Sequence, residues 1–252
     1  ADVFVYPMAD GIRKSSLFEI EVSGGGEFWE SPVYTDVAQW KTNRCKTTSW
    51  TSFATDTKPV VRVKTNAYKV EACRILPRKY NVECRILNDS IVEFELPGPG
   101  QYSVEFEEGV AIAHPLLIFV DTYPLRKPAE HTPNLIVFKK GIHEIGDNYV
   151  LKSNQTVYLA PGAYVKGQFV SDGQENITIM GQGIISGEEY PARSHNHMIS
   201  FRNCNNVLIE GVTIINAPRY CVSLSGTNQI CRNLKMMGWW FSTDGIGIGS
   251  IV

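Results

Sequence analysis

The sequence predicts an all-β protein in which an antiparallel β-sandwich precedes a parallel β-helix. Short segments with alternating apolar and polar residues follow one another through the first half, and no helical period interrupts them. In the second half, strand-like segments recur with a period in the low twenties. The 252 residues are 43% hydrophobic and 20% charged, which is enough for two domains with packed cores.

Residues 1–125 are predicted to form the sandwich domain. The segment 16–22 alternates at period two and ends in the turn Ser23-Gly24-Gly25-Gly26. Similar segments are 60–64, 84–87, 91–96, 102–106 and 116–120. The Pro/Gly turn between two of them, at 96–102, favours a hairpin. Several strands at roughly ten-residue spacing are typical of an antiparallel sandwich.

The aromatic residues of this half allow two interpretations. They form a sugar-stacking platform, or they fill the sandwich core or its contact with the second half. The residues are Phe28, Trp29, Tyr34, Trp40 and Trp50. The buried interpretation is favoured because aromatic side chains dominate the buried area of small β domains.

A linker is predicted at 126–134. The surrounding segment 122–133 holds three prolines and charges of both signs, a composition typical of connections between domains. Residues 135–252 then form the second domain.

The second domain is predicted to be a parallel β-helix because four strand-like segments follow asparagines spaced 22, 30 and 22 residues apart, Asn154, Asn176, Asn206 and Asn228. Five residues after the last three stand residues that tolerate a left-handed backbone at a bend, Gly181, Gly211 and Asn233. The asparagines are expected to form a hydrogen-bonded ladder. The longest coil carries an insertion at 188–197, which is a loop and therefore a candidate for function.

Charge and composition argue against several partners. The net charge is -2, and no block of Lys and Arg suggests binding to nucleic acid or to an anionic membrane. No apolar run approaches the roughly 18–20 residues of a membrane-spanning helix. No Cys or Cys/His spacing indicates zinc, so neither a metal nor a cofactor is expected. The oligomeric state cannot be inferred.

Secretion is indicated by two features. The six cysteines are an even number, compatible with disulfides, and three glycosylation sequons begin at Asn88, Asn154 and Asn176. Secretion to an extracellular or periplasmic location is therefore expected.

Four motifs of the second half occur in an order that resembles a known family: 158–167 (YLAPGAYVKG), 181–190 (GQGIISGEEY), 215–218 (INAP) and 243–245 (TDG). They resemble the glycoside hydrolases of the dextranase/isopullulanase family, family 49, which is similar to the polygalacturonases of family 28. The resemblance covers about residues 135–252 well and the sandwich loosely. It implies a right-handed β-helix after an N-terminal sandwich, and an inverting hydrolase of α-glucans with three aspartates on neighbouring coils.

Asp244 matches one of these aspartates, and the resemblance implies a water-activating or positioning base there. The other two, an adjacent Asp-Asp pair that includes the general acid, are expected about one coil further along. The sequence ends at Val252 and holds no such pair, so we expect that it lacks the C-terminal part of the enzyme. Ser242 stands where the polygalacturonase motif has Asn, which favours the dextranase-like branch or an unassigned relative. A turn aspartate without catalytic role is the competing interpretation.

Trp239 and Trp240 precede this carboxylate. They cannot both point inward at period two, so one is expected to face outward, where an indole ring can stack on a sugar ring.

The inserted loop supplies Arg193, His195 and His197 as candidates for hydrogen bonds to substrate hydroxyls, although a solvated polar loop is the favoured interpretation. Glu188 and Glu189 are carboxylates of the same loop and rank below Asp244 as catalytic candidates.

These observations favour a secreted, endo-acting glycoside hydrolase that cleaves an α-linked polysaccharide of the dextran or pullulan type through carboxylates. Two alternatives remain open. One is a polygalacturonase-like hydrolase or polysaccharide lyase, and the other is a non-catalytic glycan-binding β-helix, because the fold alone does not choose among them.

Overall fold

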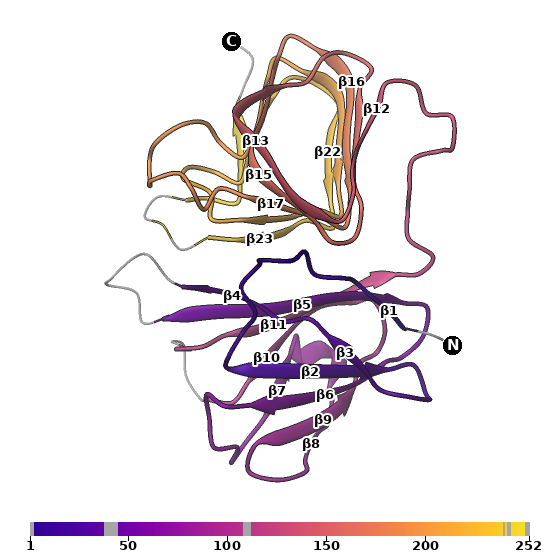
Figure 1. Cartoon of the computed structure of the whole chain (residues 1–252), viewed down its shortest axis with the longest axis vertical. Coiled ribbons are helices and arrows are strands. Elements are labelled where there is room, and N and C mark those ends of the chain that lie inside the picture. The colour runs from indigo at the N-terminus through magenta and orange to yellow at the C-terminus, as the bar shows by residue number, and fades with distance from the viewer. Residues whose placement is uncertain (1–2, 38–44, 108–111, 239, 241–242, 250–252) are drawn as a thin grey trace. The chain divides into compact units, whose positions relative to one another are not determined.

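The computed structural model describes residues 3–37, 45–107, 112–238, 240 and 243–249 (Figure 1). It divides the chain into two compact units, one formed by Ala1–Pro7 with Gly11–Arg126 and the other by Met8–Asp10 with Lys127–Val252. We describe each unit separately.

The first unit is a β-sandwich. One sheet has the strand order β1-β5-β11-β10-β7 with β4 against β5, and its strands are β1 (Val3–Val5), β4 (Tyr34–Val37), β5 (Thr47–Thr55), β7 (Arg74–Leu76), β10 (Gly100–Glu105) and β11 (Leu116–Thr122). The other has the order β3-β2-β6-β9-β8, and its strands are β2 (Phe18–Ser23), β3 (Trp29–Ser31), β6 (Val60–Thr65), β8 (Cys84–Ile86) and β9 (Ile91–Glu95). A short 3-10 helix, η1 (Arg78–Tyr80), follows β7.

Strand direction agrees with the predicted antiparallel sandwich in all but one described pair. The second sheet is antiparallel throughout, whereas β11 runs parallel to β5 in the first. Alternation places Phe18, Ile20 and Val22 of β2 in the core between the sheets. A disulfide joins Cys73 to Cys84.

The hairpin predicted at the Pro/Gly turn 96–102 is wrong. Strand β9 pairs with β6 and β8, whereas β10 pairs with β11 and β7 of the other sheet. Both sides of each strand are already occupied, so the turn carries the chain from one sheet to the other. The Tyr102 hydroxyl secures it by donating to the Gly98 carbonyl over 2.8 Å.

The five aromatic residues do not share one environment. Trp50 and Tyr34 are buried and stack with ring centroids 5.4 Å apart, but neither belongs to the apolar cluster between the two sheets. Phe28 lies beneath the Arg62 guanidinium, and Trp29 is 56% exposed. Trp40 lies outside the described residues.

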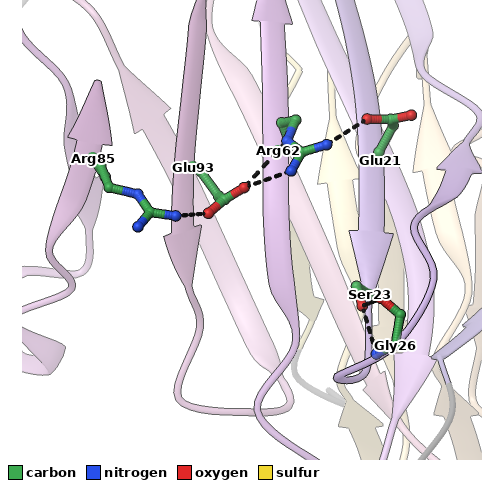
Figure 2. Close-up of polar contacts among 6 residues, drawn as sticks. All are labelled: Glu21, Ser23, Gly26, Arg62, Arg85 and Glu93. Atoms are coloured by element: carbon green, nitrogen blue, oxygen red, sulfur yellow. Dashed lines mark hydrogen bonds and ion pairs between the residues drawn. The ribbon is translucent and has the colours of Figure 1, made fainter. Parts of the chain in front are cut away.

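A row of alternating charges crosses the outer face of the second sheet (Figure 2). Glu21, Arg62, Glu93 and Arg85 are direct cross-strand neighbours on β2, β6, β9 and β8. Glu93 lies between two arginines: Arg62 contacts it at 2.8 Å, and Arg85 forms a second ion pair with it. Opposite charges directly across a sheet stabilise the strand register.

The second unit is a parallel β-helix, so the predicted fold class is confirmed. One sheet has the order β12-β14-β16-β19-β22, and its strands are β12 (Leu135–Phe138), β14 (Thr156–Leu159), β16 (Glu175–Gly181), β19 (Asn205–Glu210) and β22 (Gln229–Arg232). The remaining strands are β13 (Gly141–Val150), β15 (Ala163–Asp172), β17 (Ile184–Ser186), β18 (Ile199–Arg202), β20 (Thr213–Ile215), β21 (Val222–Ser225), β23 (Lys235–Met237) and β24 (Ile246–Gly249). The first half of β15 pairs with β17 and its second half with β18, so the described coils have three faces.

The predicted asparagine ladder is confirmed. The Nδ2 of Asn176 donates to Oδ1 of Asn154 over 2.9 Å, and Asn206 and Asn228 continue the chain of bonds over 2.5 and 3.0 Å. All four have positive φ, as does Asn134, which starts a fifth coil that the sequence analysis did not count. The bend residues Gly181, Gly211 and Asn233 also have positive φ, as predicted.

Inward side chains stack from coil to coil into one apolar core. Val165 of β15, Ile185 of β17 and Ile214 of β20 are in register and fully buried. Gly181 cannot be replaced by a larger residue at its bend, because a Cβ there would lie 2.1 Å from the Leu159 carbonyl oxygen. Close stacking of the coils therefore determines which corners carry side chains.

Candidate active site

Loops of two successive coils leave the β-helix between its second and third faces (Figure 1). In the first two coils this corner is a bend within β13 and β15, and a Cβ on Gly167 would lie 2.3 Å from the Gly146 carbonyl oxygen. In the next three coils the strands separate. The connections are residues 187–198, residues 216–221 and, in the last coil, a segment described at 238, 240 and 243–245. The strands that follow them stack in register, so the ends of these connections lie one above the other.

Backbone hydrogen bonds join the stacked loops. Gly187 N donates to the Ile215 carbonyl over 3.0 Å, and Asn216 N donates to the Met237 carbonyl over 3.1 Å. At the other end of the loops, Cys221 N donates to the Asp244 carbonyl over 3.0 Å. The sheet ladder thus continues into the loops and holds Asp244 against the preceding coil.

His197, Tyr220 and Asp244 form a column across these loops. Each stands two residues before the first residue of β18, β21 or β24, and those first residues pair with one another. The rings of His197 and Tyr220 lie 5.0 Å apart at 39°. Because adjacent rungs are about 4.8 Å apart, the column places the backbone of Asp244 one rung from Tyr220 and two rungs from His197.

His197 is held in one orientation. Tyr220 N–H donates to its Nδ1 over 3.1 Å, so the neutral ring carries its proton on Nε2. Burial, aided by the charge of Arg219, holds the pKa of His197 below its ordinary value. A neutral imidazole can donate a hydrogen bond from Nε2–H to a hydroxyl. Because it carries no positive charge, it does not form an ion pair with the Asp244 carboxylate.

Tyr220 was missed by the sequence analysis. The Tyr220 ring packs over β24, where a Cβ on Gly247 would lie 2.4 Å from Cδ2 of Tyr220. The ring is therefore placed between His197 on one side and the glycine backbone on the other. The glycines of the segment Gly245-Ile246-Gly247 were a possible signal, because a strand that alternates with glycine leaves room for a neighbouring aromatic ring.

Asp244 is exposed at the end of this column. No described residue forms a hydrogen bond or ion pair with its carboxylate, in contrast to the paired carboxylates elsewhere on the coils. The Thr243 hydroxyl next to it donates to the Trp240 carbonyl over 2.9 Å. The backbone of Asp244 is thus bonded to the preceding coil, and its side chain is exposed.

Trp240 is half-buried in the same loop. Trp239 lies outside the described residues. Sugar stacking by either ring stays a prediction.

The inserted loop has an unusual backbone. Among the described non-glycine residues with positive φ, all are asparagine except Arg193 and His195, at φ 61° and 56°. A left-handed conformation costs such residues about 1–2 kcal/mol, and strain of this kind concentrates at functional sites. His195 stacks on Tyr190 with centroids 4.5 Å apart, and its Nε2 lies 3.9 Å from an Asp147 carboxylate oxygen.

Arg193 contacts the neighbouring loop through its backbone, because its N–H donates to the Pro218 carbonyl over 2.6 Å and its carbonyl accepts from Arg219 over 3.0 Å. Of the three candidates in the insertion, His197 is the one whose described contacts join it to the Asp244 column.

Glu188 and Glu189 have a bracing role. Lys166 lies 3.0 Å from Glu188 and 3.4 Å from Glu189, and the hydroxyls of Tyr164 and Ser186 donate to Glu188. Burial acts to raise the pKa of Glu188, but the hydrogen bonds from these three groups together hold it below its ordinary value. A general acid needs a raised pKa, so Glu188 is unsuited to that task.

Within the described part of the chain, no group of three or more His, Cys, Asp and Glu side chains is arranged to hold a metal ion. No helix among the described residues is long and apolar enough to cross a membrane.

Comparison with known proteins identifies relatives over most of the chain. A dextranase of Arthrobacter globiformis is 24% identical over an alignment that is 344 residues long with its gaps and covers 94% of this chain and 54% of the relative. An isopullulanase of Aspergillus niger is 29% identical over 235 residues, covering 73% and 41%. The chain is a distant homologue of dextranases and isopullulanase. The predicted family resemblance is thereby confirmed.

A shorter and closer match is a dextranase of Talaromyces minioluteus, 45% identical over 125 residues that cover 40% of this chain and 21% of the relative. No family model matches the chain. The chain spans about half the length of the curated relatives that it matches over most of its own length.

Among solved structures, Dex49A from Penicillium minioluteum superposes with a TM-score of 0.75 over 96% of this chain and 62% of that chain, at 19% identity. At this identity the likeness shows the fold alone.

Proposed function

We propose that this chain carries part of the active site of a glycoside hydrolase that cleaves an α-linked glucan of the dextran or pullulan type. The observation that carries the proposal is the column of His197, Tyr220 and Asp244 on stacked loops, in a chain homologous to dextranases and isopullulanase. The carboxylate supplies the charge that glycoside hydrolysis requires, and the rings on the two preceding coils supply flat faces and a donor for a sugar.

Asp244 acts as the base that orients or deprotonates the attacking water in an inverting mechanism. Inversion needs a second carboxyl group roughly 6.5–9.5 Å away, which protonates the leaving oxygen. Side chains one rung apart in a β-helix and offset along their strands fall near this separation, because the rungs themselves are about 4.8 Å apart. Glu188 is not that acid, since its lowered pKa keeps it ionised.

His197 donates its Nε2–H to a substrate hydroxyl, and Tyr220 lies beneath the sugar ring next to it. Arg193, His195, Trp239 and Trp240 remain candidates for contacts to more distant sugar units. Neither a metal nor a cofactor is part of this proposal.

Export to an oxidising compartment is part of the proposal, and two structural features support it. Cys73 and Cys84 are joined by a disulfide, which persists outside the reducing cytosol. Asn88 lies in an exposed turn, where its side chain accepts bonds from Ser90 and can carry a glycan. The sequons at Asn154 and Asn176 are different, because both side chains are engaged in the ladder.

The test is the release of reducing ends from dextran, pullulan and polygalacturonate by the wild-type protein, Asp244→Asn and the control Asp172→Asn. Asp172 is an exposed carboxylate paired with Arg202 away from the loops, so its variant should retain activity. We expect cleavage of a neutral glucan and a loss of at least about a thousandfold in Asp244→Asn.

Cleavage of polygalacturonate alone would favour the polygalacturonase-like alternative. If none of the three polymers is cleaved and Asp244→Asn alters only binding, the protein is a glycan-binding β-helix and the hydrolase proposal is wrong.

A further inference from the structure

A separate groove opens in the sandwich unit. Its volume is about 630 Å³, within the ~300–1,000 Å³ typical of small-molecule sites. One wall is the segment 80–83, which leads from η1 to β8, and the opposite wall is residues 93–97 at the end of β9. Nothing in the proposed hydrolysis uses this groove.

One wall of the groove is aromatic. Phe94 and Leu96 are buried in the sandwich core behind the lining, so the groove lies against the edge of that core. Tyr80 is 41% exposed and leans on buried Tyr102, with ring centroids 5.9 Å apart. The Lys79 amine lies 4.9 Å from the Tyr80 centroid, and its flexible stem lets it move aside. A ring supported in this way can stack on a flat apolar ligand face at little cost in side-chain entropy.

The rim carries donors and acceptors of both signs. Glu93 is held between Arg62 and Arg85 (Figure 2), so it presents a fixed carboxylate. Hydrogen bonds from Arg62, and then from Arg85, keep the pKa of Glu93 below its ordinary value despite its burial.

The other charged groups of the rim are Lys58, Glu83 and Glu95, all exposed. With Arg85 and Glu93 they make two cations and three carboxylates, so the groove offers no net attraction to an anion. A phosphate or a uronic acid would meet the carboxylates, and a purely apolar ligand would leave the rim groups without partners.

We propose that this groove binds a neutral oligosaccharide, with one sugar ring on Tyr80 and hydroxyl groups bound by the mixed rim. The choice of a glucan rests on the proposed function, and the groove is then a second attachment point for the same polymer. Attachment of one glucan molecule at two points raises the local concentration of substrate at the active site without a new catalytic group.

The test uses isomaltotriose as the neutral probe and trigalacturonate as the anionic one. Hydroxyl-radical footprinting of the wild-type protein should show Tyr80 protected by isomaltotriose and not by trigalacturonate. Tyr123, which is 43% exposed and lies outside the groove lining, is the internal control and should be unchanged.

Two variants complete the experiment. Tyr80→Ala should weaken retention on cross-linked dextran beads about tenfold, whereas Tyr123→Ala should not weaken it. Glu95→Gln should weaken it less than Tyr80→Ala while leaving the fold unchanged, because Glu95 is exposed. Thermal unfolding checks that each variant is folded.

The inference is overturned if Tyr80 is unprotected by isomaltotriose, or if folded Tyr80→Ala is retained like the wild type. Stronger protection by trigalacturonate would overturn the charge argument. Hydrolysis is measured separately with Asp244→Asn, so glucan cleavage without Tyr80 protection refutes only the groove. Tyr80 protection without cleavage refutes only the hydrolase.

Discussion

The asparagine ladder allows a quantitative prediction about the stability of the β-helix. Asn176 donates one side-chain hydrogen bond and accepts another, and its backbone is left-handed at φ 56°. Each exposed hydrogen bond between asparagine side chains contributes on the order of 0.5–1 kcal/mol to stability. Placing an alanine in the left-handed conformation costs about 1–2 kcal/mol. We expect Asn176→Ala to lower the free energy of unfolding by about 3 kcal/mol.

Two further variants separate the contributions. Asn176→Gly removes the same hydrogen bonds but adopts positive φ without strain, so it should lose about 1 kcal/mol less than Asn176→Ala. Asn228 makes one described ladder bond instead of two, so Asn228→Gly should be milder than Asn176→Gly by one hydrogen bond.

Urea titrations followed by circular dichroism would measure these differences. Equal stability of Asn176→Ala and Asn176→Gly would refute the argument from backbone conformation. Equal losses in Asn176→Gly and Asn228→Gly would refute the argument that the ladder bonds stabilise the coils.

Two further predictions concern carboxylates. Because the pKa of Glu93 is lowered in the folded state, its contribution to stability is present above about pH 4.3 and is lost as the pH falls through the folded pKa. Urea titrations from pH 6 to pH 3 should therefore show that the free energy of unfolding falls less with acid in Arg62→Ala than in the wild type. The same fall in both proteins would contradict this. Glu188→Gln should cost about 1–2 kcal/mol by removing the charge that faces Lys166, and it should reduce hydrolysis because the loop with the site residues begins there. Glu189 is more exposed, so Glu189→Gln is the matched control and should change stability and hydrolysis little. Equal effects of the two substitutions would contradict the role of Glu188 in holding the loop.

The repeat was readable from the sequence because each coil obeys local backbone chemistry. A bend in a parallel coil needs a left-handed residue, and asparagine and glycine adopt that conformation at least cost. The spacing of Asn154, Asn176, Asn206 and Asn228 therefore indicated both the coil length and the ladder. The first coil was missed because Asn134 lies at the edge of the predicted linker.

The site was only partly readable. Asp244 and His197 stood out as a motif aspartate and a loop histidine, whereas Tyr220 lies in a short connection with no motif of its own. Its position depends on the register between coils whose loops differ in length. The hairpin error at 96–102 has a similar origin, since a Pro/Gly turn specifies that the chain reverses and not which sheet receives the next strand.

The sequence by itself determined the order of a sandwich and a β-helix, the corners of the coils and the motif aspartate, because period, chirality and turn chemistry act over a few residues. The tertiary structure alone decided that His197, Tyr220 and Asp244 share one column, and that Glu188 is braced by Lys166. It also decided that the segment 80–83 and the end of β9 enclose a groove. These arrangements join residues from separate strands and loops, and only the stacking of coils and the pairing of sheets brings such residues together.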